Sequence, residues 1–190
     1  MSIKYNSPVI LTFALICSAV FFGNNILAGT LMDYFTVKNT IDWTNPLSIF
    51  SLFSHVIGHG SLEHLLGNMT FILLLGPIVE EKYGSKFTLL MIALTALITG
   101  ILNIAFFNTG LLGASGIVFM LILLVSFTNV KGGQIPLTFI LVAVLFIGKE
   151  VIQSLQSDQV SQFAHIIGGV CGSIFGFVGK KEKSNRSSNA

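Results

Sequence analysis

The chain has 190 residues, of which 53% are hydrophobic and 9% are charged, and its 10 basic and 8 acidic side chains leave a net charge of +2. Soluble domains carry about 25% charged residues, so this chain has too few to cover a water-exposed surface. The composition excludes a cytosolic globular enzyme, a disordered chain and a nucleic-acid-binding protein. It indicates a membrane protein whose partner is the lipid bilayer.

Six apolar segments follow one another along the chain. They run from about Pro8 to Ala28, Ser61 to Val79, Phe87 to Phe107, Leu111 to Thr128, Ile135 to Gly148 and Val160 to Gly179. Backbone amides in the bilayer core must be paired within their own segment, so each segment is expected to be a helix. A span needs about 20 residues, and this length holds six spans and little else. We predict an all-α, multi-pass domain over residues 1–179.

The longest connection, residues 29–60, mixes polar residues with the apolar run Leu47–Phe53 and contains the single tryptophan, Trp43. This mixture predicts a loop that lies partly in the membrane interface between the first two spans. Residues 180–190 are polar and rich in lysine and serine, which predicts a disordered tail.

The basic residues predict the orientation of the spans, because cytoplasmic loops carry an excess of Lys and Arg. With six spans, the side of the N-terminus carries Lys4, Lys82, Lys86, Lys131, Lys180, Lys181, Lys183 and Arg186, and the other side carries Lys38 and Lys149. Both termini and the tail are therefore expected in the cytoplasm. The small size and simple architecture fit a protein of a bacterial inner membrane. A cleaved signal peptide ending near Ala28 is an alternative that the charge count leaves open.

Four polar residues inside the spans point to a functional site, because polar groups are costly in a bilayer. His64 and Asn68 lie in the second span, Ser115 in the fourth and His165 in the sixth. These three spans start from the same external side. At 1.5 Å per residue, His64, Ser115 and His165 lie roughly 5–8 Å from the helix ends. The spacing predicts that these residues converge on one pocket.

These residue types suit nucleophilic catalysis. A serine needs a base, usually a histidine, and burial keeps a histidine in the neutral form that a base requires. Ser115 lies among small residues at the start of its helix, where free amides and the helix dipole are available. Backbone amides, Asn68 and His64 are possible donors to an oxyanion. No carboxylate lies at this depth, so the prediction is a dyad.

Three motifs carry a resemblance to a known family. They are the run from His59 to Asn68 (HGSLEHLLGN), Gly113-Ala-Ser-Gly116, and the run from Ala164 to Gly172 (AHIIGGVCG). In their order and placement on alternate spans they resemble the rhomboid intramembrane serine proteases in their minimal six-helix form. The resemblance implies that Ser115 is the nucleophile and His165 its general base.

The resemblance also implies supporting roles. His64, Asn68 and the Ser115 amide would form the oxyanion hole, His59 and His55 would lie at or near the pocket mouth, and Glu80 would be structural. Gly113, Gly116, Phe119, Gly168 and Gly172 would shape or pack the site; glycines spaced by four residues also permit close helix approach. Two positions depart from the family pattern: Phe119 stands where many members have a tyrosine, and Thr44 follows Trp43 where many have an arginine.

The function implied is hydrolysis of transmembrane substrate proteins, without metal or cofactor, with substrate helices entering between the second and fifth spans. One alternative is a rhomboid-like protein that binds transmembrane helices without cutting them. Another is a metal site on His55, His59 and Glu63, which are four residues apart and would share one face of an unbroken helix. Gly58 and Gly60 disfavour that helix, and Ser61 is better interpreted as the N-cap of the second span.

Overall fold

The computed structural model describes residues 5–126, 137, 140–141, 144–145 and 159–187. Over this part of the chain the fold is helical, with no named strand. Its elements are α1 (Pro8–Ile26), the short 3-10 helix η1 (Met32–Tyr34), α2 (Pro46–Ser54), α3 (Leu62–Tyr83), α4 (Ser85–Phe106), α5 (Ser115–Ser126) and α7 (Gln159–Ser187). The prediction of an all-helical protein is confirmed.

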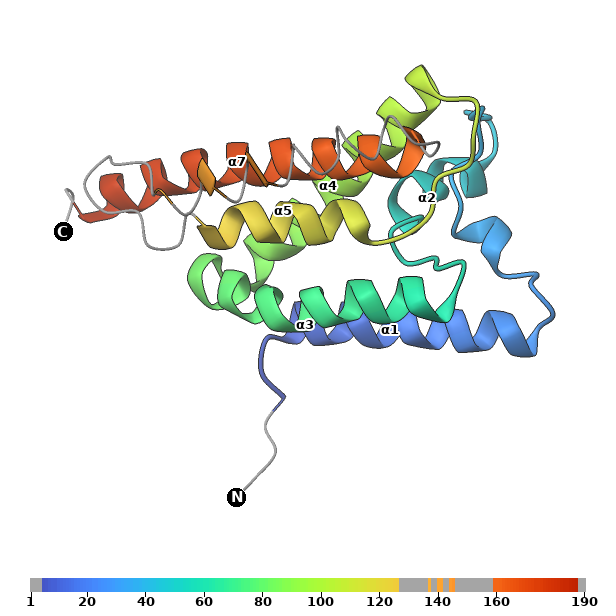
Figure 1. Ribbon diagram of the computed structural model, residues 1–190, viewed down its shortest axis with the longest axis horizontal. Coiled ribbons are helices and arrows are strands. Elements are labelled where there is room, and N and C mark those ends of the chain that lie inside the picture. The colour runs from blue at the N-terminus through green and yellow to red at the C-terminus, as the bar shows by residue number, and fades with distance from the viewer. Residues whose placement is uncertain (1–4, 127–136, 138–139, 142–143, 146–158, 188–190) are drawn as a thin grey trace.

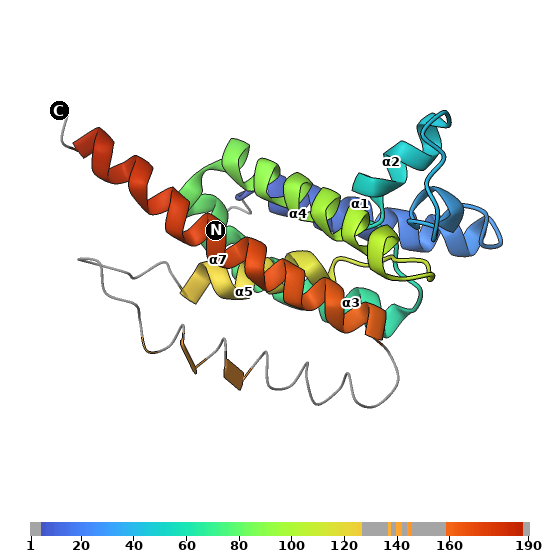
Figure 2. The same cartoon turned by 90° about the horizontal axis from the view of Figure 1, so that it is seen from above.

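The long helices form a bundle in which α3, α5 and α7 run in one direction and α1 and α4 in the opposite direction (Figure 1). Helix α5 packs against both α3 and α7, and α1 packs against α3. The starts of α3, α5 and α7 lie toward the end of the bundle that carries η1 and α2 (Figure 2). The predicted site residues His64, Ser115 and His165 lie near these three helix starts. The topology therefore brings them to one end of the bundle (Figure 1).

Three of the described helices, α1, α3 and α4, are long and apolar enough to cross a membrane. Helix α5 and the apolar stretch Phe163–Val178 of α7 are shorter. The predicted fifth span, Ile135–Gly148, lies outside the described residues except at five positions. The count of six spans therefore stays a prediction.

Two predicted boundaries differ from the structure. Helix α5 begins at Ser115 rather than at Leu111, because the preceding residues form a turn that contains Gly113 with φ of 118°. Helix α7 continues to Ser187, beyond the predicted end of the sixth span near Gly179. Lys, Glu and Arg are good helix formers, and these residues prolong a helix that the apolar stretch has already nucleated.

Glu80 fastens the start of α1 to the end of α3. Its Oε1 accepts a hydrogen bond from the Val9 amide at 3.1 Å, and its Oε2 accepts one from the Ile10 amide at 3.0 Å. The first amides of a helix have no partner within the helix, and their positive end favours a carboxylate. Glu80 is buried, so this contact accounts for a charged residue inside the bundle. The structural role implied for Glu80 matches this geometry.

Candidate active site

Ser115 is the first residue of α5 and is half-buried. The turn before it is held by the Gly113 amide, which donates to the His55 carbonyl at 2.9 Å. A φ of 118° at Gly113 lies in a region that side chains rarely adopt, so glycine suits this position. The turn places Ser115 at a helix N-terminus, where the first amides are free to donate.

A second restraint holds the segment before Ser115 from the side of the first long loop. Val37 and Leu111 exchange two backbone hydrogen bonds, each of 2.9 Å, and form an isolated antiparallel bridge. The Asn103 side chain in α4 donates to the Thr109 carbonyl at 2.9 Å. These contacts could not be predicted from the sequence, because backbone pairing between two distant loops does not require particular side chains.

His64 packs directly on the turn that leads to Ser115. A Cβ built on Gly113 would lie 2.5 Å from Cε1 of the His64 ring, so the ring occupies the space that a side chain would need. The Ser61 side chain accepts a hydrogen bond from the His64 amide at 3.2 Å, which confirms Ser61 as the N-cap of α3. His64 is therefore held at the start of α3 and against the serine turn.

Asn68 and His59 are joined by a hydrogen bond whose direction can be assigned. His59 Nδ1 lies 3.0 Å from the Ile57 carbonyl, which can only accept, so Nδ1 carries the proton. His59 Nε2 then accepts from the Asn68 amide nitrogen at 3.1 Å. An amide nitrogen has two hydrogens, so Asn68 retains a second one. The His59 and His64 rings also meet edge to face, with their centroids 5.0 Å apart.

His165 lies against α5 one turn beyond Ser115. Its ring and that of Phe119 have centroids 4.3 Å apart and planes inclined by 34°. Ser115 and Phe119 are four residues apart, so they share one face of α5. The Phe119 and His165 rings thus join α5 to α7 close to Ser115.

Close packing of α7 on α5 positions His165. A Cβ added at Gly168 would collide with the Gly116 carbonyl, and one added at Gly172 would collide with the Met120 carbonyl. On the other side, a Cβ at Gly116 would lie 3.3 Å from the Ala164 carbonyl. The glycines let the two backbones approach, as small residues do in membrane helix pairs.

His55 is buried away from these groups. Its Nδ1 lies 3.2 Å from the Ser51 carbonyl and its Nε2 lies 3.3 Å from the Thr99 hydroxyl, so its ring links α2 to α4. Burial lowers the pKa of His55 to about 4 and that of His59 to about 4. Both rings are therefore neutral at pH 7.

The structure does not support the metal alternative. Helix α2 ends at Ser54 and α3 begins at Leu62, so His55, His59 and Glu63 do not share a continuous helix. The two histidine rings bind separate partners, as described above. Among the described residues, no three His, Cys, Asp or Glu side chains form a cluster that could hold a metal ion.

Comparisons with known proteins fit this arrangement. The family model of the rhomboid domain matches residues 46–182. Over 140 residues the chain is 25% identical to the rhomboid protease GlpG of Haemophilus influenzae, covering 72% of this chain and 73% of that protein. Over 121 residues it is 30% identical to the rhomboid proteases GlpG of two Klebsiella pneumoniae strains, covering 63% of this chain and 44% of those proteins.

The chain thus spans less than half the length of the Klebsiella relatives. The family match includes α2, α3, α4, α5 and the part of α7 that carries His165. It covers well over half of the chain, so the protein belongs to the rhomboid family.

Proposed function

We propose that this protein is an intramembrane serine endopeptidase that cleaves peptide bonds in or near transmembrane helices of other membrane proteins. The observation that carries the proposal is the convergence of Ser115, Phe119, His165 and His64 from three helices at one end of the bundle. The family match and the name of the similar proteases support the same reaction class.

In the proposed reaction, Ser115 Oγ attacks the carbonyl carbon of the scissile bond while His165 accepts the hydroxyl proton. The carbonyl oxygen becomes an oxyanion, and its donors are the Ser115 amide and the Asn68 and His64 side chains. His165 then gives the proton to the leaving amine, which leaves an acyl ester on Ser115. Water hydrolyses the ester by the same steps, with His165 first as base and then as acid.

The stacking of Phe119 on His165 restricts the rotation of the imidazole, which suits a general base that must keep one orientation. The hydrogen bond from Asn68 to His59 fixes the plane of the Asn68 amide and leaves its second hydrogen for an oxyanion. The two proposed side-chain donors thus come from α3, and the proposed base comes from α7.

The test is cleavage of a panel of transmembrane substrates by the purified protein in liposomes. Ser115→Ala and His165→Ala are expected to abolish cleavage. Ser126→Ala is the matched control, because Ser126 lies in the same helix and its hydroxyl donates one turn back to the Ile122 carbonyl. Undiminished cleavage by Ser115→Ala would refute the proposal.

An active-site probe separates catalysis from mere binding of transmembrane helices. A fluorophosphonate is expected to label Ser115 in the wild type and in Ser126→Ala, and to label His165→Ala far more weakly. Asn68→Ala is expected to lower kcat by about 10²-fold if its amide donates to the oxyanion. A wild-type chain that binds substrate helices but neither cleaves them nor reacts with the probe would favour the non-catalytic alternative.

The proposed setting is a cell membrane with both termini in the cytoplasm and the serine toward the outer face. The excess of basic residues on the side of the N-terminus supports this orientation. Labelling of single cysteines placed at Lys38 and Lys86, in a background without Cys17 and Cys171, distinguishes the two faces. A cysteine at Lys38 should react with an impermeant reagent in intact cells, and one at Lys86 only after permeabilisation.

A further inference from the structure

Helix α2 turns most of its large apolar side chains outward. Leu47, Phe50 and Phe53 are exposed, whereas Ser51, Leu52 and Ser54 are buried. The buried hydroxyls are paired, since Ser51 donates to the Ser48 carbonyl at 2.7 Å and Ser54 to the Tyr34 carbonyl at 2.6 Å. A helix that turns large apolar side chains outward is suited to contact with lipid.

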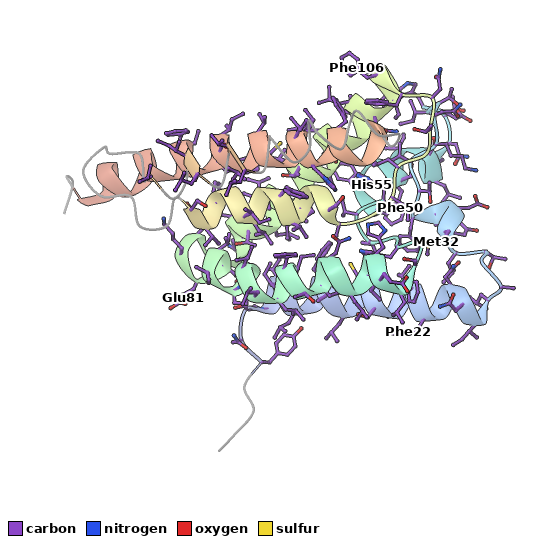
Figure 3. The ribbon with its side chains drawn as sticks, in the orientation of Figure 1. Phe22, Met32, Phe50, His55, Glu81 and Phe106 are labelled. Carbon is purple, nitrogen blue, oxygen red and sulfur yellow. The ribbon has the colours of Figure 1, made fainter. Side chains whose placement is uncertain are left out.

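The neighbouring residues place this helix near the membrane surface. Trp43, just before α2, is 67% exposed, and tryptophan favours the interface between hydrocarbon and water. Phe50 and Met32 lie at one end of the bundle, whereas Glu81 lies at the other (Figure 3). The long first loop and α2 are thus suited to lie among lipid headgroups.

A polar pocket of about 440 Å³ opens beside α2 in this loop. Asp33 and Lys38 contribute to its lining from the segment around η1, and Asp42 and Ser48 from the segment around the start of α2. The volume is in the range of sites that bind small molecules. Leu47 lines the pocket and is also 52% exposed, so the polar pocket borders the exposed apolar face of α2.

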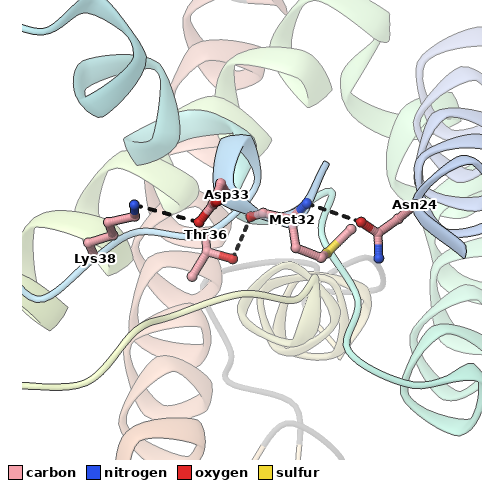
Figure 4. A network of polar contacts seen from close by, with 5 residues as sticks. All are labelled: Asn24, Met32, Asp33, Thr36 and Lys38. Atoms are coloured by element: carbon pink, nitrogen blue, oxygen red, sulfur yellow. Dashed lines mark hydrogen bonds and ion pairs between the residues drawn. The ribbon is translucent and has the colours of Figure 1, made fainter. Parts of the chain in front are cut away.

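Hydrogen bonds order the loop that leads into one side of the pocket (Figure 4). The Asn24 side chain at the end of α1 accepts from the Leu31 and Met32 amides at 3.1 and 3.2 Å. The Thr36 hydroxyl donates to the Met32 carbonyl at 2.8 Å. These bonds join the loop to α1 and fix the backbone that carries Asp33 and Lys38. The backbone positions of Asp33 and Lys38 are therefore fixed by hydrogen bonds within the protein.

Both signs of charge face this pocket. Lys38 Nζ lies 3.5 Å from Asp33 Oδ1, and both side chains are largely exposed, so the lysine remains open to another anion. Asp42 accepts from the Thr44 amide at 2.9 Å and the Thr44 hydroxyl at 2.6 Å, and these bonds lower its pKa. One ammonium and two carboxylates suit a ligand that carries both an anion and a cation.

We propose that this pocket binds the headgroup of a phospholipid with a phosphate and a primary amine, of the phosphatidylethanolamine type. Lys38 binds the phosphate and Asp42 binds the ammonium group of the lipid. The acyl chains leave the pocket past Leu47 and lie against Phe50 on the exposed face of α2. The site is distinct from Ser115, and it does not depend on the proposed protease activity.

The test is lipid binding by the purified full chain, measured by native mass spectrometry after exposure to defined phospholipids. The wild type is expected to retain phosphatidylethanolamine at least 5-fold better than phosphatidylglycerol, which has the phosphate but no amine. Asp42→Asn keeps an oxygen to accept from the Thr44 amide but removes the charge, so the preference should disappear. Lys38→Gln should weaken retention of both lipids.

Matched controls come from the opposite end of the bundle, where Glu81 and Lys86 are also exposed. Glu81→Gln and Lys86→Gln remove the same charges and should leave retention of both lipids unchanged. Equal retention of both lipids by the wild type, or wild-type binding by Asp42→Asn and Lys38→Gln, would overturn the proposal. Displacement by soluble phosphoethanolamine at an equal concentration would also overturn it, because the acyl contacts would then contribute nothing.

Discussion

The rings of Phe119 and His165 stack with their centroids 4.3 Å apart, which joins α5 to α7 next to the proposed nucleophile. Aromatic pairs of this kind contribute about 0.5–1.5 kcal/mol beyond the burial of their area. A contact of this strength is sufficient to select one orientation of the imidazole. It also helps to hold the proposed base in place beside Ser115.

Replacing Phe119 should therefore lower activity without abolishing it. We expect Phe119→Ala to reduce kcat/KM by about 2- to 10-fold, which corresponds to the energy of the lost ring contact. Phe119→Tyr keeps the ring and should retain most of the activity. The measurement is cleavage of one transmembrane substrate in liposomes. If Phe119→Ala and Phe119→Tyr lose activity equally, the stacking has no such role.

Because α7 packs closely on α5, replacing a glycine at their contact by a larger residue should lower stability. In Gly168→Ala the new methyl group meets the Gly116 carbonyl, and a backbone atom cannot move away as a side chain can. We expect the free energy of unfolding to fall by roughly 1–3 kcal/mol, as in other overpacked interiors. Unfolding in detergent measures this. Gly67→Ala is the control, because no heavy atom lies within 4 Å of its added Cβ.

Much of the fold and of this site could be predicted from the sequence, for definite physical reasons. The glycines of α7, the cap at Ser61 and the position of Ser115 at a helix start are local features that residue types encode. The bridge between Val37 and Leu111 depends on two loops 74 positions apart in the chain, and backbone pairing leaves no mark on the side chains. The extension of α7 to Ser187 has no apolar periodicity to mark it, because the residues after Gly179 are mostly polar.

Glu80 offers a test of how α1 is held in the bundle. Glu80→Ala leaves the Val9 and Ile10 amides without their acceptor, and we expect a loss of about 1–3 kcal/mol in the free energy of unfolding. Hydrogen exchange at these two amides should accelerate. Glu81→Gln is the control, because Glu81 is the exposed neighbour. Unchanged exchange at Val9 and Ile10 in Glu80→Ala would show that the carboxylate does not hold α1.

The buried histidines predict how stability depends on pH. Burial lowers the pKa of His55 to about 4, from an ordinary value of 6.5. Between pH 6.5 and 4 the unfolded chain binds a proton at His55 that the folded chain does not, so stability falls as the pH is lowered through this range. The loss approaches about 3 kcal/mol at pH 4.

His55→Gln isolates this contribution, because glutamine has no proton to gain in this range. The difference in Tm between the wild type and His55→Gln should shrink as the pH falls from 7 to 4.5, although the variant is less stable at pH 7. Thermal unfolding in one detergent at several pH values measures the difference. A constant difference in Tm over this range would mean that His55 titrates alike in the folded and unfolded chains.

Replacing Gly113 tests whether the backbone turn before Ser115 is needed for the proposed chemistry. In Gly113→Ala the methyl group would lie 2.5 Å from the His64 ring, and the residue would have to keep a φ of 118°. The ring and the serine turn must then move apart, which displaces two of the proposed oxyanion donors together. Loss of one such donor typically costs about 10²–10³-fold in kcat, so at least a 10²-fold decrease is expected.

Gly60→Ala is the matched control for Gly113→Ala. Gly60 lies in the loop before α3, and its added Cβ would come no closer than 3.9 Å to Leu112. We expect this variant to cleave the transmembrane substrate at nearly the wild-type rate. Tm must be measured for both variants, because a large drop for Gly113→Ala would explain its inactivity by unfolding. If Gly113→Ala folds and cleaves as fast as Gly60→Ala, the turn at Gly113 does not position the oxyanion donors.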